Sequence, residues 1–348
     1  MNTTGERADD PVRCRVTVIL AAHGEAETPG FRENFMVGHR TLSHVAEVMP
    51  LPAPLRLAIC TMGAARKRFA GGEGSPHNAL TRRQAQALDE QLAGDEANAF
   101  RVVPAFGSSL PLVDSLLEGD AAEGLSIVVS MTPIDSHLAC GRLCHLLVHA
   151  KASVGEARVL ARFWDDPDFI GVNVEHVFSH LQLPDNSGRC ALVLVMHGTL
   201  VRDAKGRVPD FHTGLQESVV YARRLREAFA TDPRSPFCRI EIAHLNHDVG
   251  GEWTRPTLEE VLKGLAAEGV DAVAAYPCEY LVDGSDTVGK VAAALATGGI
   301  RQTQRLPCLN DAPGLIALLA RRIQGLVSEQ MDAPGRHCDA CPLTSTDV

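Results

Sequence analysis

The sequence predicts an α/β protein made of two similar, doubly wound parallel-sheet lobes with a cleft between them. Short runs rich in β-branched and apolar residues alternate with amphipathic helical stretches, a pattern typical of parallel strands joined by crossover helices. The pattern restarts after the turn-rich segment 183–188. In each half the first strand runs directly into a His-Gly pair, at His23 and again at His197.

The first half is expected to form an N-terminal lobe over residues 15–182, after a flexible N-terminus over 1–14. Its apolar runs predict four strands, and the polar-apolar periodicity between them predicts two helices. The strands are expected at 15–21, 99–106, 126–132 and 157–163, and the helices at 80–94 and 137–150.

The second half is expected to form a C-terminal lobe over 189–326, connected by the linker 183–188 and followed by a tail over 327–348. Strands are expected at 190–196, 238–245, 271–277 and 304–310, with helices at 215–230, 257–269 and 311–323.

Composition excludes several classes of protein. The 348 residues include 33 basic and 43 acidic side chains, and the net charge of -10 has the wrong sign for a nucleic-acid partner. The first residues lack the basic segment and apolar core of a signal peptide, and no apolar run reaches the roughly 18 residues of a membrane span. We therefore expect a cytoplasmic protein, whose ten cysteines are thiols or metal ligands.

The two His-Gly pairs are the first candidate site. Ligands of open parallel sheets bind at the carboxyl ends of the strands, so both imidazoles are expected to face the cleft. Imidazole accepts a proton near neutral pH and is a common ligand for divalent transition metals. The alternative is that each histidine only hydrogen-bonds the loop that follows its strand.

Three carboxylates are expected at the same edge of the second sheet. Glu279, Asp283 and Asp286 follow the strand predicted at 271–277 and precede a helix. Carboxylates beside His197 suit proton removal and metal handling. The alternative is that Asp283 or Ser285 is the N-cap of that helix.

Five segments of the chain resemble, in order, segments of the ferrochelatase family. "LVLVMHGTLVRDAKGRVPDF" is similar to that family's strand leading into His-Gly, an arginine-containing loop and an acidic-aromatic stretch. "YPCEYLVDGSDT" resembles its Gly-Phe-Val-Ser-Asp-His-x-Glu-Thr segment. The other three are "GEGSPHNALTRRQAQALDEQL", "NHDVGGEWTRPTLEEVLKGLAAEGVDAVAAYP" and "LPCLNDAPGLIALLARRI", and the resemblance spans about residues 16 to 326.

This resemblance implies a chelatase-like fold and insertion of Fe²⁺, as the substrate metal, into a tetrapyrrole such as protoporphyrin or coproporphyrin in haem biosynthesis. The family's histidine falls on His197, the expected base, and its catalytic glutamate falls on Asp286. Removal of two pyrrole protons requires a base near the ring centre and an acidic relay. Asp283 and Glu279 are expected to take part in this relay and to lie at the substrate. His197 and Asp286 are expected to contact the metal as well.

Departures from the family leave two alternatives open. The carboxylate of Asp286 is one methylene shorter than the family's glutamate, and Lys290 stands where the family often has an acidic residue. At His23 the chain looks instead like the related cobalt and nickel chelatases, which implies a metal-delivery ligand. The alternatives are cobalt or nickel insertion into a sirohydrochlorin-type tetrapyrrole, and a non-catalytic haem or porphyrin carrier or sensor.

Two loops offer further residues. Arg202, five residues after His197, is expected to hold a substrate propionate through a bidentate pair, with a solvated surface loop as the alternative. His247 follows a predicted strand and could line the cleft, but a loop histidine is more often exposed to solvent or pins its loop, so we leave it out of the catalytic set.

The tail contains Cys338 and Cys341 in a Cys-x-x-Cys motif. Some ferrochelatases carry a 2Fe-2S cluster near this end, and Cys140 and Cys144 could complete a four-thiolate set. The alternative is a pair of buried thiols and a disordered tail. Sequence leaves open the oligomeric state and whether the protein makes peripheral contact with a membrane to collect an apolar ring.

Overall fold

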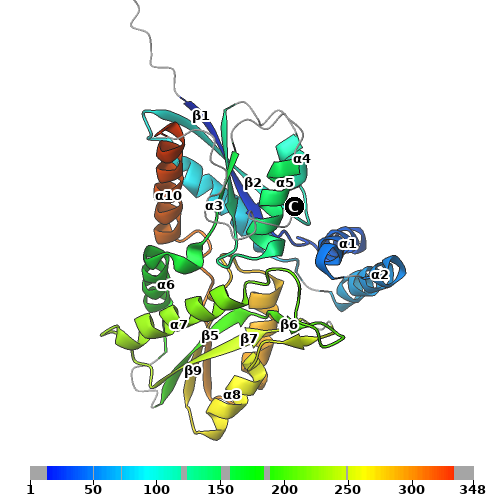
Figure 1. Cartoon of the computed structure of the whole chain (residues 1–348). Helices are drawn as coiled ribbons and strands as arrows, with labels where there is room; N and C mark the ends of the chain where they lie inside the picture. Colours follow the sequence, from blue (N-terminus) through cyan, green and yellow to red (C-terminus); the bar gives the residue numbers. More distant parts are fainter. Residues whose placement is uncertain are drawn as a thin grey trace, which may run out of the picture.

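Two four-stranded parallel sheets, one in each lobe, form the frame of the molecule (Figure 1). This computed structural model describes residues 14–49, 51–71, 73–118, 124–149, 157–183, 189–247 and 250–332. The strand orders are β2-β1-β3-β4 and β10-β9-β5-β7. The expected α/β fold with two doubly wound parallel-sheet lobes is confirmed.

The first sheet is built around β1, whose residues are apolar on both faces. Val18, Ile19 and Leu20 are fully buried, as is typical of a central strand covered by helices on both sides. The strand pairs with β2 on one side and with β3 on the other. The strands are β1 (Cys14–Ala22), β2 (Asn98–Phe106), β3 (Leu125–Ser130) and β4 (Ala157–Leu160).

The second sheet repeats this arrangement around β5, and a small two-stranded antiparallel sheet, β6 with β8, lies beside it. The strand expected at 304–310 is wrong in position, because only Gln302–Arg305 pairs with β9. Proline has no N–H to donate to a ladder, and Pro307 instead offers its carbonyl to His176 Nε2 at 3.0 Å. The strands are β5 (Cys190–His197), β6 (Leu200–Arg202), β7 (Arg239–Leu245), β8 (Glu252–Trp253), β9 (Ala272–Tyr276) and β10 (Gln302–Arg305).

Helices cover both sheets, and two π-helical turns, η2 (His137–Gly141) and η4 (Asp286–Lys290), precede α5 and α9. Two helices that were not predicted from the sequence, α1 and α2, pack against each other and project from the first lobe in Figure 1. The helices are α1 (Phe31–Val48), α2 (Ala53–Ala70), α3 (His77–Leu92), α4 (Val113–Glu118), α5 (Arg142–His149), α6 (Pro167–His180), α7 (Leu215–Thr231), α8 (Leu258–Ala267), α9 (Val291–Thr297) and α10 (Pro313–Asp332), with a 3-10 turn η3 (Phe163–Asp165).

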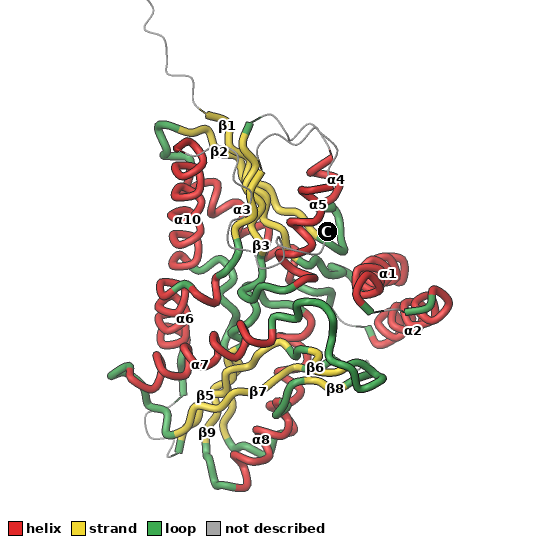
Figure 2. Tube along the Cα trace, viewed as in Figure 1, coloured by secondary structure: helices red, strands yellow, loops and turns green. Residues whose placement is uncertain are grey.

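The two halves of the chain exchange a helix. Figure 2 shows α10, from the end of the second half, beside α3 of the first lobe, and Gln324 Nε2 donates to Asp95 Oδ2 there at 3.0 Å. Conversely, α6 packs against α7 of the second half, and Glu175 of α6 forms an ion pair of 2.6 Å with Arg234, three residues after the end of α7. One contiguous cluster of buried apolar residues therefore joins the two sheets, and it includes Leu20 and Leu192.

Three of the expected segments fall wholly or partly outside the described residues. The flexible N-terminus is described only at residue 14, the linker 183–188 only at residue 183, and the tail only to residue 332. Residues 327–332 of the expected tail belong to α10. Within the described ranges, none of the helices has the length and apolar character needed to cross a bilayer.

Candidate active site

Both His-Gly pairs lie at the carboxyl end of the central strand of their sheet. His197 is the last residue of β5, and His23 follows β1 directly. The glycines are required because a neighbouring loop approaches closely: a Cβ on Gly24, which has φ +82°, would overlap Ser109, and a Cβ on Gly198 would overlap Asn246. The two histidines thus occupy equivalent positions, as expected from the sequence, and each is followed by a glycine against which a neighbouring loop packs closely.

The hydrogen bonds of His197 indicate which ring nitrogen carries the proton. Its Nδ1 lies 3.0 Å from the carbonyl oxygen of Gly198, which can only accept, so Nδ1 is the protonated nitrogen. Its Nε2 lies 3.0 Å from Nε2 of His247, which then donates to the Nε2 lone pair. Burial, reinforced by His247, lowers the pKa of His197 to about 4, although the Asp286 carboxylate opposes this shift. At neutral pH His197 is thus a neutral imidazole with its lone pair at Nε2.

Glu279 lies directly beneath His197. Its Oε2 accepts a hydrogen bond of 2.9 Å from the backbone N–H of His197 and one of 3.2 Å from the Ser218 hydroxyl. Burial raises the pKa of Glu279 to about 8, although these two hydrogen bonds oppose the shift. The group is therefore mainly a neutral carboxylic acid at pH 7.

Aromatic rings surround the two histidines. Tyr280 lies 5.6 Å from His197 and Trp253 lies 5.4 Å from His247, measured between ring centroids. This cluster was not predicted from the sequence, from which His247 was left out of the catalytic set. The available signal was a histidine just after β7, the strand next to β5 in the sheet.

Asp286 begins η4 and is half-buried. Its negative charge raises the pKa of both His23 and His197, so the carboxylate lies near both imidazoles. Lys290, one turn further on, forms an ion pair with it at 2.9 Å. At this position, where the chain departs from the family, the lysine thus places a cation beside the carboxylate.

His23 has different surroundings. Its ring is exposed, and Nε2 lies 3.5 Å from the Thr41 hydroxyl. The enclosing protein nevertheless lowers the pKa of His23 by desolvation, against the opposing charges of Glu25 and Asp286. Solvent reaches this ring, yet enough of the protein lies around it to disfavour its charged form.

Two other predicted residues lie in structural roles. Asp283 is buried and accepts hydrogen bonds from Arg305 at 2.7 Å, Thr287 at 2.9 Å and Asn310 at 3.0 Å. These contacts fix the segment between β9 and η4. Arg202 is exposed, donates to the Gly206 carbonyl at 3.0 Å and lies 3.5 Å from Glu252.

The cysteines are only partly described. Cys140 is buried in η2, with Sγ 3.8 Å from the carbonyl oxygen of Ser136, and Cys144 is half-buried in α5. Cys338 and Cys341 lie outside the described residues. Across the described ranges, His, Cys, Asp and Glu side chains form no group of three or more that could hold one metal ion.

The two parallel-sheet lobes, with a strand-end histidine from each near one carboxylate, define a protein of the chelatase fold. A family model described as Ferrochelatase matches residues 15–326. The chain belongs to the ferrochelatase family, and the expectation of a ferrochelatase-like enzyme is confirmed.

Individual relatives agree with this assignment. The ferrochelatase of Azoarcus sp. (strain BH72) is 28% identical, over 72% of this chain and 69% of that one. The ferrochelatase of Thermosynechococcus vestitus is 25% identical, over 82% of this chain and 74% of that one. Among solved structures, SirB from Bacillus subtilis with Fe3+ has a TM-score of 0.54 at 9% identity, covering 92% of this chain and 98% of that one. This last similarity concerns the fold.

Proposed function

We propose that this chain inserts Fe²⁺ into a porphyrin in haem biosynthesis, with His197 as the base. The observation that carries the proposal is the neutral imidazole of His197, whose ring lies close enough to Asp286 and His23 for both to act on its pKa. Metalation replaces two pyrrole protons by one Fe²⁺ ion, so a base must be available in its neutral form at physiological pH.

The two pyrrole protons pass one after the other to Nε2 of His197. His247 donates to this nitrogen, so it must yield its place when the ring nitrogen arrives. The imidazolium that forms is stabilised by the Asp286 carboxylate, which then relays the proton away. Glu279 is already protonated at neutral pH, so it supports the His197 backbone and does not take up the proton.

His23 and Asp286 would bring the ferrous ion to the ring. A neutral imidazole and a carboxylate are suitable ligands for Fe²⁺. His197 would contact the metal only as it enters the ring. Residues that pass a substrate metal onward do not need the closed geometry of a resident metal site.

Other residues would hold the tetrapyrrole. Tyr280 and Trp253 offer aromatic surface beside His197 and His247. Arg202 would exchange its contact with Glu252 for a substrate propionate. Asp283 would act through the segment that it anchors and not by contact with the ring.

Anaerobic turnover tests the proposal. Purified protein is mixed with protoporphyrin, coproporphyrin or sirohydrochlorin and with ferrous, cobaltous or nickel ions, and tetrapyrrole absorbance is followed. Fe²⁺ insertion into a porphyrin is expected for the wild type and for His180→Ala, an exposed histidine on α6, and is expected to be lost in His197→Ala.

Other outcomes identify the alternatives. Preferred insertion of cobalt or nickel into sirohydrochlorin would replace iron as the substrate and would agree with the histidine at position 23. Tight ring binding without metalation in any combination would leave a carrier or sensor.

We further propose that the protein collects its ring at an anionic membrane surface, reached from the cytoplasm. Helix α2 carries four basic side chains and no acidic one, in a chain with net charge -10. Its exposed apolar residues include Phe69, at 87% exposure, and Met62, at 64%. Basic side chains together with exposed apolar side chains on one helix favour contact with an anionic lipid interface.

Vesicle flotation tests this contact. Binding is expected to vesicles containing phosphatidylglycerol but not to pure phosphatidylcholine, and it should weaken in Phe69→Ser. Val219→Ser, at an exposed apolar position of α7, serves as the matched control. Equal flotation of both variants would remove α2 as the contact.

A 2Fe-2S cluster is the remaining proposal. Cys140 and Cys144 lie one helical turn apart, which fits half of a four-thiolate set, and Cys338 and Cys341 would supply the rest. Visible absorption and acid-labile sulfide after anaerobic purification are expected to reveal the cluster, and Cys140→Ser should abolish it, whereas Cys60→Ser in α2 should not. Wild-type protein without labile sulfide after reconstitution would contradict the cluster.

A further inference from the structure

A carboxylate from the first lobe reaches directly into the site of the second lobe. Glu25, two residues after His23, accepts a hydrogen bond of 2.9 Å at Oε2 from the backbone N–H of Ser285. The Ser285 hydroxyl donates to the same oxygen. Because Ser285 immediately precedes Asp286, this contact joins the first lobe to the start of η4.

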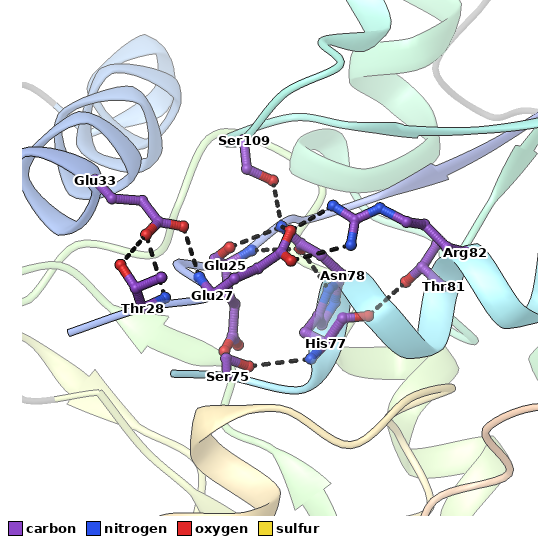
Figure 3. A network of polar contacts seen from close by, with 10 residues as sticks. All are labelled: Glu25, Glu27, Thr28, Glu33, Ser75, His77, Asn78, Thr81, Arg82 and Ser109. Carbon is purple, nitrogen blue, oxygen red and sulfur yellow. Dashed lines mark hydrogen bonds and ion pairs between the residues drawn. The ribbon is translucent and has the colours of Figure 1, made fainter. Parts of the chain in front are cut away.

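The backbone of Glu25 is fixed by a buried amide. Asn78 of α3 accepts from the Glu25 N–H at 2.9 Å and donates to the Glu25 carbonyl at 2.8 Å. Asn78 is 1% exposed and also donates to the Ser109 hydroxyl, so its position is fixed by α3 and by the loops that follow β1 and β2. Figure 3 shows the contacts of Asn78 with Glu25, Glu27 and Ser109. The carboxylate that crosses to the second lobe therefore starts from a rigid base.

The second lobe leaves room for this carboxylate. A Cβ added to Gly284 would lie 2.8 Å from Oε1 of Glu25, closer than ordinary contact. The φ of Gly284 lies outside the left-handed region, so its conformation alone does not require glycine. A side chain at position 284 would therefore push the Glu25 carboxylate away from its place beside Ser285.

We propose that Glu25 is a positioning residue for metalation, which fixes Asp286 relative to His23 and His197 by bonding Ser285 across the two lobes. The inference rests on the proposed function, because metalation is its readout. The charge of Asp286 acts on both histidines, one from each lobe. The position of its carboxylate relative to them therefore depends on how the two lobes are joined at Ser285. Small displacements of a proton-transfer group cost rate far more than affinity.

Steady-state anaerobic metalation by four variants tests the proposal. Glu25→Ala is expected to lower kcat roughly 10-fold while the KM for porphyrin changes less than about 2-fold. Glu25→Gln should retain most of the activity, because the amide oxygen can still accept both bonds from Ser285. Gly284→Ala should lower kcat in the wild-type background and have no effect in the Glu25→Ala background, where the added methyl group meets no carboxylate.

The matched control is Glu27→Ala. Glu27 lies in the same loop and bonds Arg82 and Asn78, both within the first lobe, so its kcat is expected to stay at the wild-type value. If Glu25→Ala and Glu27→Ala have the same kcat, or if the Gly284→Ala effect multiplies with that of Glu25→Ala, the positioning role is wrong while the proposed function stands. If the wild type metalates no ring with any metal, both fail together.

Discussion

The two His-Gly pairs lie at equivalent ends of β1 and β5, but their imidazoles differ in surroundings. His197 is held by the Gly198 carbonyl and by His247, with the carboxyl group of Glu279 beneath its backbone. His23 is exposed beside the Thr41 hydroxyl. A repeated fold position thus supports one fixed imidazole, suited to accept a proton, and one accessible imidazole, suited to exchange a metal ion.

Replacing the fixed imidazole should have the largest effect. His197→Ala is expected to lower kcat by about 100-fold or more, since general-base catalysis contributes roughly 10²–10⁴-fold. Single-turnover metalation under anaerobic conditions measures this loss. A smaller loss in His197→Ala than in His23→Ala would reverse the roles assigned to the two lobes.

The second largest effect is expected from removing the negative charge of Asp286, which lies near both histidines. Asp286→Asn is expected to lower kcat roughly 10- to 100-fold, because the amide neither stabilises protonated His197 nor accepts its proton. The pKa of both histidines should fall, since the carboxylate raises both. Histidine NMR titration checks this shift, and a fall for one histidine alone would show that Asp286 serves a single lobe.

Replacing the accessible imidazole of His23 should weaken the binding of the metal ion and leave the binding of the tetrapyrrole ring unchanged. His23→Ala is expected to raise the KM for Fe²⁺ by about 10-fold with a smaller change in kcat, because a delivery ligand contributes mainly to metal binding. Metal titrations at saturating porphyrin measure it. An unchanged KM for every metal would exclude delivery through this residue.

Removing the partner of His197 should have a modest effect. His247→Ala is expected to change kcat at neutral pH by less than about 5-fold, and to raise the pKa of His197, because His247 helps to lower it. The acid limb of the pH profile of kcat/KM should therefore move to higher pH. An acid limb at its wild-type position would mean that His247 does not act on the base.

The smallest effect concerns stability. The pKa of Glu279 is about 8 in the folded protein and near 4.5 when unfolded, so the folded state holds this proton more tightly. This contribution to stability is complete below about pH 4.5 and is lost as pH rises towards 8. Glu279→Gln should flatten the fall in Tm over this range, whereas the exposed Glu259→Gln should not. Parallel slopes for both variants would mean that Glu279 ionises freely in the folded state.

Sequence reasoning predicted what depends on local pattern. Apolar runs located most strands, and the rule that sites lie at strand ends placed His23 and His197 correctly at the carboxyl edges. What it missed depends on contacts between distant segments. His247 reaches His197 across 50 residues of sequence, and Asp283 is occupied by Arg305 from the next strand.

The exchanged helices determine whether fragments of the chain can fold on their own. Neither half of the sequence contains all the helices that cover its own sheet, because α10 covers the first lobe and α6 contacts the second. Cleavage within 183–188 would therefore yield two complementary fragments that need each other to fold, and not two autonomous domains. The two His-Gly pairs therefore mark a repeat of the parallel sheets, but not of complete lobes, because each half contributes one helix to the other half.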